Sequence, residues 1–208
     1  MFELSAEKVN NFLDYRNAIR SHGFSVSPCV MRSDSVATKS APYHPLELDA
    51  ESIDFLSALP SDQKSKTLHV VGANVESEQL TERLRGCADF WQRYGICLKF
   101  VNCNLKANVE RVSTLNDMEQ FLAESFNFRA VHSPNNHLLL FLKTFKHPRV
   151  LGLTLKCRRT GKPHVAIFES RLCPREISDI LNHELGHLIG LKHNPSANHL
   201  MNRRYCSA

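Results

Sequence analysis

The sequence predicts an α/β (α+β) fold, in which strands and helices alternate along the chain. Two observations carry this prediction. Short apolar stretches recur between residues 67 and 169 and are separated by turn residues, as strands are. Stretches with apolar residues at helical spacing lie between them and after them. The chain has 208 residues and 42% hydrophobic content, which suffices for one hydrophobic core and a small appended unit.

The first 62 residues are predicted to form a separate N-terminal helical segment. Apolar spacing indicates a helix over about residues 5–20, and the polar stretch 32–45 is typical of a loop or linker. Asp49 is expected to cap a short helix that Pro60 ends. Three interpretations of residues 1–62 stay open: a pro-segment, a docking or export segment, or an N-terminal embellishment.

The stretch from Lys66 to Cys103 predicts a strand, a long helix and a second strand. Residues 67–71 (T-L-H-V-V) are typical of a strand that Gly72 ends. Residues 76–94 carry apolar side chains at helical spacing up to Gly95, and we expect this face, Trp91 included, to pack in the core. Residues 97–103 alternate as a half-buried strand does.

The second half of the chain predicts a buried strand, a hairpin and a final helix. Residues 117–126 indicate a short inserted helix, and the leucine-rich stretch 137–145 is typical of a strand buried on both faces. Residues 149–156 and 164–169 are expected to form a hairpin-like pair. Pro174 then stands where a first helical turn tolerates proline.

That final helix carries the residues to which metal chemistry can be assigned. In N-H-E-L-G-H-L-I-G-L-K-H, His183 and His187 are four residues apart and share one helix face. Glu184 stands beside the first of them, where it can act as a general base. Gly190 allows a turn with positive φ, which can bring His193 round as a third ligand. Three protein ligands and one open position are typical of a catalytic rather than a structural zinc.

At these residues the chain resembles the metzincin metallopeptidases, whose signature is H-E-x-x-H-x-x-G-x-x-H followed by a Met-turn. The resemblance implies that His183, His187 and His193 hold one Zn²⁺ and that Glu184 is the general base. Met201, eight residues after the third histidine, matches the Met-turn of the matrixin-like branch. The archaemetzincin-like branch is disfavoured because it has a cysteine directly after the third histidine.

Two departures from the matrixin-like pattern lie after the third histidine. Asn194 stands where matrixins usually carry serine, and the sequence ends seven residues past Met201, which affects the expected wall of the specificity pocket. Tyr205 lies four residues after Met201 rather than two, so we do not assign it as a tyrosine ligand of the astacin type.

The resemblance also implies a fold and a place for substrate. It predicts a metzincin-like zincin catalytic domain over residues 63–208, with a twisted mixed sheet, a long backing helix, a zinc-binding active-site helix and an antiparallel edge strand that binds extended peptide. Residues 150–156 are the candidate strand, so Gly152, Leu153 and Thr154 are candidate substrate-binding residues. A hairpin strand with a tolerated glycine is the alternative.

The function predicted from this resemblance is a zinc-dependent endopeptidase that acts on a protein or peptide substrate. Two alternatives stay open: a host-directed effector or toxin protease of narrow specificity, and a zinc-bearing binding module without catalysis. The family favours a secreted or exported protein, although M-F-E-L-S-A-E-K-V-N does not have the apolar stretch of a secretory signal peptide.

Composition argues against several other classes of protein. A net charge of +5 without a dense basic cluster does not indicate nucleic-acid binding. No run of about 18 apolar residues is present, so no membrane span is predicted. Most of the seven cysteines are expected to be reduced and buried, because their number is odd and none forms a C-x-x-C pair.

Two residues that could belong to the site are interpreted as ordinary ones. His199 is close to the motif in sequence, but we expect a solvated histidine in a turn. Cys29, in S-P-C-V-M-R-S-D, is without the flanking arginine and glycine of the family's cysteine switch, so we interpret it as a plain cysteine.

Overall fold

The computed structural model describes most of the chain after residue 45 and one short strand before it. The described residues are 26–30, 46–72, 78–103, 112, 114, 117–118, 120–121, 133–143, 150–157, 161–168, 174–196 and 198–202. Among them, no helix combines the length and apolar character needed to cross a bilayer. The predicted helix over residues 5–20 and the linker 32–45 lie outside this part of the chain, as does most of the predicted helix 117–126.

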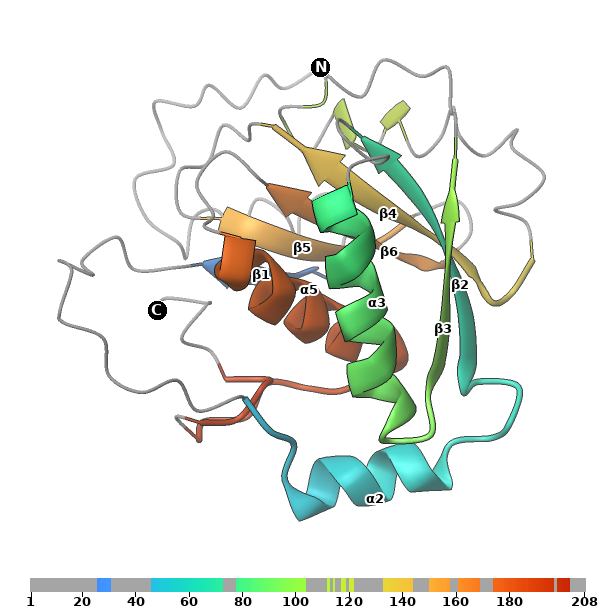
Figure 1. The fold of residues 1–208 in the computed structure, drawn as a ribbon, viewed down its shortest axis with the longest axis vertical. Helices are drawn as coiled ribbons and strands as arrows, with labels where there is room; N and C mark the ends of the chain where they lie inside the picture. Colours follow the sequence, from blue (N-terminus) through green and yellow to red (C-terminus); the bar gives the residue numbers. More distant parts are fainter. Residues whose placement is uncertain are drawn as a thin grey trace, which may run out of the picture.

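A mixed sheet organises the described residues (Figure 1). Its order is β1-β5-β6-β4-β2-β3, in which β2, β3, β4 and β6 run parallel and β5 runs antiparallel to both of its neighbours. The mixed α/β fold class predicted from the sequence is therefore confirmed. The strands are β1 (Val26–Val30), β2 (Ser65–Gly72), β3 (Cys97–Asn102), β4 (Asn136–Leu142), β5 (Val150–Lys156) and β6 (Pro163–Phe168).

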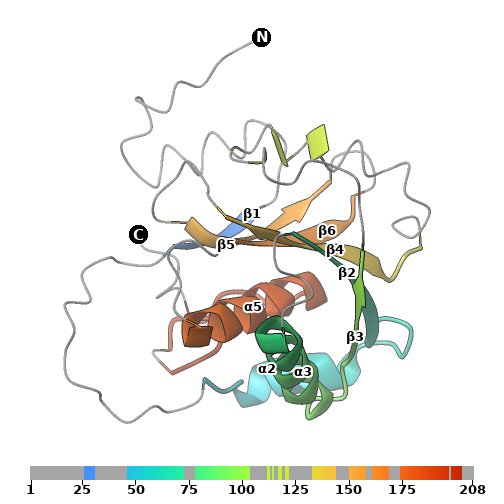
Figure 2. The same cartoon turned by 45° about the horizontal axis from the view of Figure 1, so that its top comes forward.

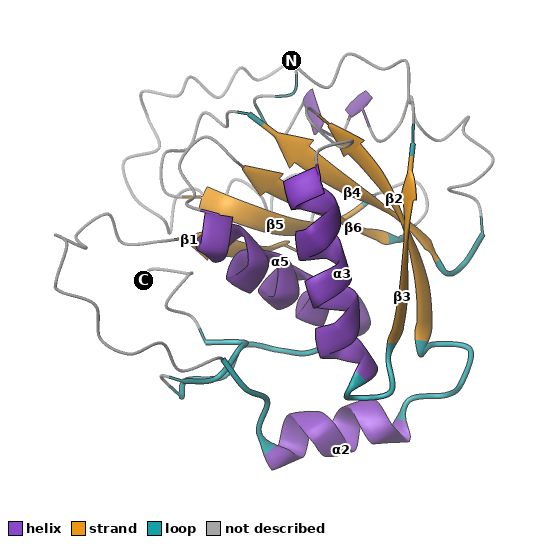
Figure 3. Cartoon of the chain, in the orientation of Figure 1, coloured by secondary structure: helices purple, strands orange, loops and turns teal. Residues whose placement is uncertain are grey.

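The helices lie on one side of this sheet, as Figure 2 shows most clearly. They are α2 (Ala50–Ala58), α3 (Glu78–Gln92) and α5 (Pro174–Ile189). Helices α3 and α5 cross the face of the sheet, whereas α2 lies beyond its end, below α3 and α5 in Figure 3. One layer of strands and one layer of helices therefore enclose the core.

The sequence of β4 explains why it lies inside the sheet. In N-H-L-L-L-F-L every residue after Asn136 is buried. Leu139 and Phe141 belong to the core cluster shared with the helices, while Leu138 and Leu140 are equally buried on the opposite face. A strand with parallel neighbours on both sides and apolar residues on both faces is the expected result, and the prediction is confirmed.

Helix α3 is amphipathic and turns its apolar face inward. Leu80, Leu84, Cys87 and Trp91 are buried, at the spacing of one helical face. Gly95 follows the helix with φ +74°, a conformation that residues with a Cβ rarely adopt. Trp91 is fully buried in the core cluster, as the sequence predicts.

The antiparallel strand β5 is not at the edge of the sheet, which corrects one expectation. Its pairing with β6 is antiparallel, as predicted for the hairpin. On its other side, however, β1 pairs along it, with Ser27 opposite Thr154 and Cys29 opposite Gly152. The antiparallel edge of the sheet is therefore β1, a strand that the sequence analysis placed in no element.

The described part of the N-terminal segment contacts the rest of the chain. Asp49 caps α2, since its Oδ1 accepts a hydrogen bond of 2.9 Å from the Ser52 amide, and the helix ends at Ala58, before Pro60. Leu56 is fully buried in the same core cluster as the strands and α5. The division of the chain at residue 62 stays a prediction.

Four of the cysteines lie in the part of the chain whose side chains are described, and all four are free thiols. Cys87, Cys103 and Cys157 are buried, while Cys97 is exposed. Burial raises the pKa of Cys87 to about 12, so this thiol stays protonated near neutral pH. For these residues the expectation of mostly reduced and buried cysteines is confirmed.

Candidate metal centre

Helix α5 places two imidazoles of the motif side by side. His183 and His187 are one turn apart, and their ring centroids are 4.7 Å apart. His183 is fully buried and His187 is half-buried. Glu184, the next residue after His183, is also fully buried.

The turn at Gly190 ends α5 and redirects the chain. Gly190 has φ +117°, its amide donates to the carbonyl of His187 at 3.1 Å, and the amide of Leu191 donates to that of Gly186 at 2.9 Å. This pair of bonds is the Schellman motif, in which glycine is favoured because the position has positive φ. The motif brings the residues after Leu191 back toward the two helical histidines.

Backbone carbonyls fix the tautomers of these two histidines. A carbonyl oxygen can only accept, so Nδ1 of His183 donates to Leu200 at 2.8 Å and Nδ1 of His187 donates to Leu191 at 2.9 Å. In the neutral ring, Nε2 then carries the lone pair. Metal-ligating histidines are usually held this way, with the second ring nitrogen bonded to a carbonyl or carboxylate.

His193 completes a group of three imidazoles. Its Nε2 lies 3.1 Å from Nε2 of His187, and its ring centroid lies 5.4 Å from that of His183. The ligand atoms of the three histidines all lie within 4.8 Å of one another. Two nitrogens bound to a tetrahedral zinc at about 2.0–2.1 Å would stand roughly 3.3 Å apart. The three residues therefore fit a zinc ion, and the structure brings together the ligands predicted from the sequence.

Burial keeps the two helical imidazoles neutral, as metal ligands need to be. It lowers the pKa of His187 to about 4 and the pKa of His183 well below its ordinary value. In both cases removal from water is the main cause, because it disfavours the charged form. For His183 the neighbouring His187 lowers the pKa further.

Met201 packs against the helical turn that carries the histidines. It is fully buried, and its sulfur occupies the space that a Cβ on Gly186 would need. Gly186, which lies between His183 and His187, therefore has to be glycine for the methionine to approach. The carbonyl of Met201 also accepts from the amide of Asn194 at 2.8 Å, which ties it to the residue after His193.

Two of the predicted substrate-binding residues of β5, Gly152 and Thr154, lie against Glu184. Oγ1 of Thr154 lies 2.6 Å from Oε2 of Glu184 and 3.0 Å from its backbone carbonyl. A Cβ on Gly152 would lie 3.0 Å from Cγ of Glu184, so the glycine permits a close approach to α5. Leu153 is fully buried. A role of these three residues in binding substrate stays a prediction.

His199 contradicts its interpretation as a solvated residue. It is 4% exposed, and its Nδ1 accepts from the Met201 amide at 2.9 Å. Its Nε2 therefore carries the proton and lies 3.2 Å from Oδ1 of Asp49. The sequence predicts Asp49 only as a helix cap, because Asp49 and His199 are far apart in sequence and no local pattern links them.

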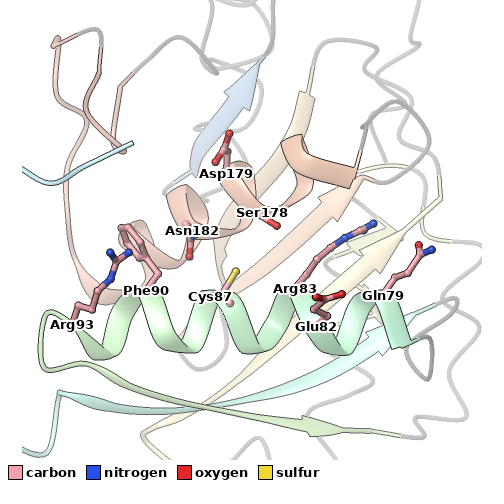
Figure 4. Close-up of a pocket in the computed structure, with 10 residues that line it drawn as sticks. Gln79, Glu82, Arg83, Cys87, Phe90, Arg93, Ser178, Asp179 and Asn182 are labelled. Atoms are coloured by element: carbon pink, nitrogen blue, oxygen red, sulfur yellow. The ribbon is translucent and has the colours of Figure 1, made fainter. Parts of the chain in front are cut away.

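A separate hollow of about 580 Å³ lies between α3 and α5 (Figure 4). Both helices contribute charged side chains to it, among them Arg83 and Glu82 of α3 and Asp179 of α5. Asn182 also lines the hollow, although its neighbour His183 does not. The hollow is therefore distinct from the three-histidine group.

Comparisons with known proteins assign the chain to no family. No family model matches the sequence, and no curated protein matches it. A solved structure that resembles it is the crystal structure of archaemetzincin (amzA) from Methanopyrus kandleri, with a TM-score of 0.43 and 14% sequence identity. The match covers 67% of this chain and 81% of that chain. A likeness this distant indicates neither the chemistry nor the branch of a family, so function is inferred below from the site.

Proposed function

We propose that this protein is a zinc-dependent endopeptidase of the metzincin type, in which Glu184 is the general base. The observation that carries the proposal is the pairing of two features on α5. Three histidines present ligand atoms within 4.8 Å of one another, and a buried glutamate directly follows the first of them. Ligation needs the histidines, but it does not need a glutamate at that position, so the glutamate points to hydrolysis.

When bound by His183, His187 and His193, zinc would supply Lewis acidity for the attacking water and the substrate carbonyl. Glu184 takes the proton as the water attacks the carbonyl carbon of a peptide bond. The same carboxyl then gives that proton to the amide nitrogen, which has to be protonated to leave as an amine. The buried position of Glu184 excludes competing water and strengthens its interactions with charge.

The β5 contacts orient this carboxylate. Thr154 donates to Oε2 and so holds the carboxylate in one orientation relative to the three histidines. The absence of a side chain on Gly152 lets the carboxylate lie against the strand. Gly152 and Thr154 both belong to β5, which pairs with β6 on one side and with β1 on the other.

The substrate class that fits this arrangement is an extended peptide. Main-chain pairing with β5 would hold such a peptide beside Glu184, and peptides commonly bind sheet edges in this way. Since β1 of the same chain pairs with β5, a substrate that uses this edge has to replace β1. We expect hydrolysis to be slow until that replacement occurs.

The alternative of a non-catalytic zinc module has less support. Such a module would use the histidines but would have no need of the hydrogen bond from Thr154 to the Glu184 carboxylate. The alternative of an effector or toxin protease shares the chemistry and differs only in substrate and delivery.

The experiment is cleavage of a broad quenched-peptide library by the zinc-loaded full chain. Glu184→Gln is expected to keep zinc and to reduce kcat by 10²-fold or more, because general-base catalysis typically contributes about 10²–10⁴-fold. His187→Ala is expected to lose the metal. Zinc content is measured for each protein, and 1,10-phenanthroline serves as the metal-removal control.

Two outcomes would contradict the proposal. Full activity of Glu184→Gln would exclude the general-base role. Cleavage that persists after the metal is removed would exclude zinc-dependent hydrolysis. The binding-module interpretation is favoured instead if the protein binds zinc but neither the unsubstituted chain nor Cys29→Pro, a substitution that weakens the pairing of β1 with β5, cuts any peptide.

A further inference from the structure

The loop that carries His193 and Met201 is fastened to a remote part of the chain, the start of α2. We propose that Asp49 is a positioning residue for the metal centre: it fixes the loop 193–202, so that the third ligand is set by the N-terminal segment. This inference rests on the proposed zinc site but not on its hydrolytic activity.

Asp49 contacts the loop at two points with two different oxygens. Its Oδ2 accepts from Nδ2 of Asn194 at 2.6 Å, and Asn194 directly follows the third ligand. Its Oδ1 lies 3.2 Å from Nε2 of His199. The carboxylate therefore bridges the beginning and the end of the loop. Hydrogen bonds that involve an ionised group are stronger than neutral ones.

The Asp49 carboxylate is held ionised in this position. Its pKa is lowered to about 2, mainly by hydrogen bonds from Ser52 and additionally by the contact with His199. The same carboxylate is thus the N-cap of α2 and the anchor of the loop. A displacement of α2 would therefore be transmitted to the loop.

His199 connects Asp49 to Met201 through its two ring nitrogens. One ring nitrogen is directed at Asp49 and the other accepts from the Met201 amide, so the ring connects α2 to the methionine beneath the histidines. Ser52 adds a contact of 3.3 Å between its Oγ and Nε2 of His199.

Backbone contacts connect the same segment to His183. The carbonyl of Glu47 accepts from the Leu200 amide at 2.8 Å, and the Glu47 amide donates to the carbonyl of Asn198 at 3.4 Å. The carbonyl of Leu200 in turn accepts from Nδ1 of His183. Glu47 is therefore hydrogen-bonded directly to Leu200, the residue whose carbonyl fixes the tautomer of His183.

Helix α2 also contacts the turn that starts the loop. A Cβ on Gly190 would lie 3.2 Å from Cζ of Phe55, so the ring of Phe55 lies over the glycine that ends α5. Phe55 is 42% exposed, whereas Leu56 beside it is fully buried and anchors the helix in the core. Residues of α2 therefore contact both the turn before the loop and His199 within it.

Asp49→Ser separates the two roles of this residue. Serine is a good N-cap, so α2 keeps its capping hydrogen bond, but the shorter side chain does not reach Asn194 or His199. Asn194→Ala leaves the cap intact and removes the contact with Asp49, together with the bond of 2.8 Å that its own Oδ1 accepts from the Ser196 amide within the loop. Asp54→Ser is the matched control, because Asp54 is an exposed acidic residue on the same helix.

The test uses the full chain and three measurements that do not depend on hydrolysis. Zinc affinity is measured by competition with a chelator. The visible absorption of the Co²⁺-substituted protein reports the geometry of the ligands. The urea midpoint of the metal-free protein reports stability. Asp49→Ser and Asn194→Ala are expected to weaken zinc binding about tenfold and to change the cobalt spectrum, as losses of outer contacts at metal sites do.

The outcomes separate this inference from the proposed function. If both variants bind zinc as tightly as the unsubstituted protein and give its cobalt spectrum, the positioning role is wrong. If they are less stable but unchanged in affinity and spectrum, the contacts are merely structural and the role is again wrong. Should Asp49→Ser fail to fold, Asn194→Ala decides the question. A protein without affinity for either ion would contradict both proposals, whereas metal binding without peptide cleavage would contradict only the hydrolytic one.

Discussion

Thr154 is the residue through which β5 acts on the Glu184 carboxylate. The contact of 2.6 Å between Oγ1 and Oε2 is buried on both sides, since Thr154 is 6% exposed and Glu184 is fully buried. A buried hydrogen bond to a charged group contributes about 1.5–3 kcal/mol. The hydroxyl therefore has a large effect on how the carboxylate is held.

We expect Thr154→Val to lower kcat about tenfold or more while zinc content stays unchanged. Valine keeps the shape of threonine but cannot donate, so the carboxylate loses the bond that orients it, and each 1.4 kcal/mol corresponds to about tenfold in rate. Thr154→Ser keeps the hydroxyl and is the matched control, for which we expect most of the activity to return. Equal losses in both variants would assign the effect to packing.

At the scale of elements, strand β1 covers the edge of β5 that the proposed peptide substrate would use. It pairs with β5 over Val26–Val30, and Gly152 and Thr154 of β5 lie opposite Cys29 and Ser27. Pro28 has no amide hydrogen and is tolerated at the outer edge of a sheet only where its nitrogen points away from the neighbouring strand. This favours an arrangement in which the amides of Ser27 and Cys29 face β5.

Cys29→Pro is therefore expected to weaken the pairing of β1 with β5 and to raise kcat/KM for peptides. One lost hydrogen bond corresponds to about 1 kcal/mol, or roughly fivefold in the fraction of chains with a free β5 edge. Peptide hydrolysis and zinc content are measured together. Unchanged hydrolysis at full zinc content would mean that substrate does not use the edge of β5.

Cys29→Ala serves as the matched control for that substitution. It removes the thiol but keeps the backbone amide. If Cys29→Ala raised hydrolysis as much as Cys29→Pro, the side chain rather than the strand pairing would be responsible. Equal activity of Cys29→Ala and the unsubstituted protein is the expected result.

Buried histidines make the stability of the whole molecule depend on pH. His164 and His137 are 3% exposed, and burial lowers their pKa values to about 3 and about 4. Nδ1 of His164 accepts from the Leu138 amide at 3.0 Å, a bond that protonation of this nitrogen would abolish. Both rings lie on the sheet, away from the three-histidine group.

The sign of the effect follows from proton binding. Between about pH 6.5 and the lowered pKa values, the unfolded chain binds more protons than the folded one, so stability falls as the pH falls. From pH 7 to pH 4.5 we expect a loss of about 2 kcal/mol for each of these two histidines. Urea unfolding of the metal-free protein measures it. His164→Asn, which keeps an acceptor but does not titrate, should show a smaller loss, and an identical pH dependence would contradict this account.

The sequence by itself determined the local helices and strands and the residues of the candidate metal site. The periodicity of apolar residues predicted α3, β4 and the β5–β6 pair, because in each of these elements the buried residues follow a regular spacing along the chain. The spacing of His183, His187 and His193 indicated ligands for the same reason. Two of them share a helix face, and a glycine allows the turn before the third.

Only the tertiary structure decided which residues surround the candidate metal site. Strand β1 lies beside β5, and Asp49 lies beside Asn194 and His199, although 145 residues separate Asp49 from Asn194 in sequence. Position 186 has to be glycine because the sulfur of Met201 occupies the space that a side chain on this residue would need. Such contacts depend on how whole elements pack. A periodicity or a motif depends only on residues that are close in the sequence, so it does not predict these long-range contacts.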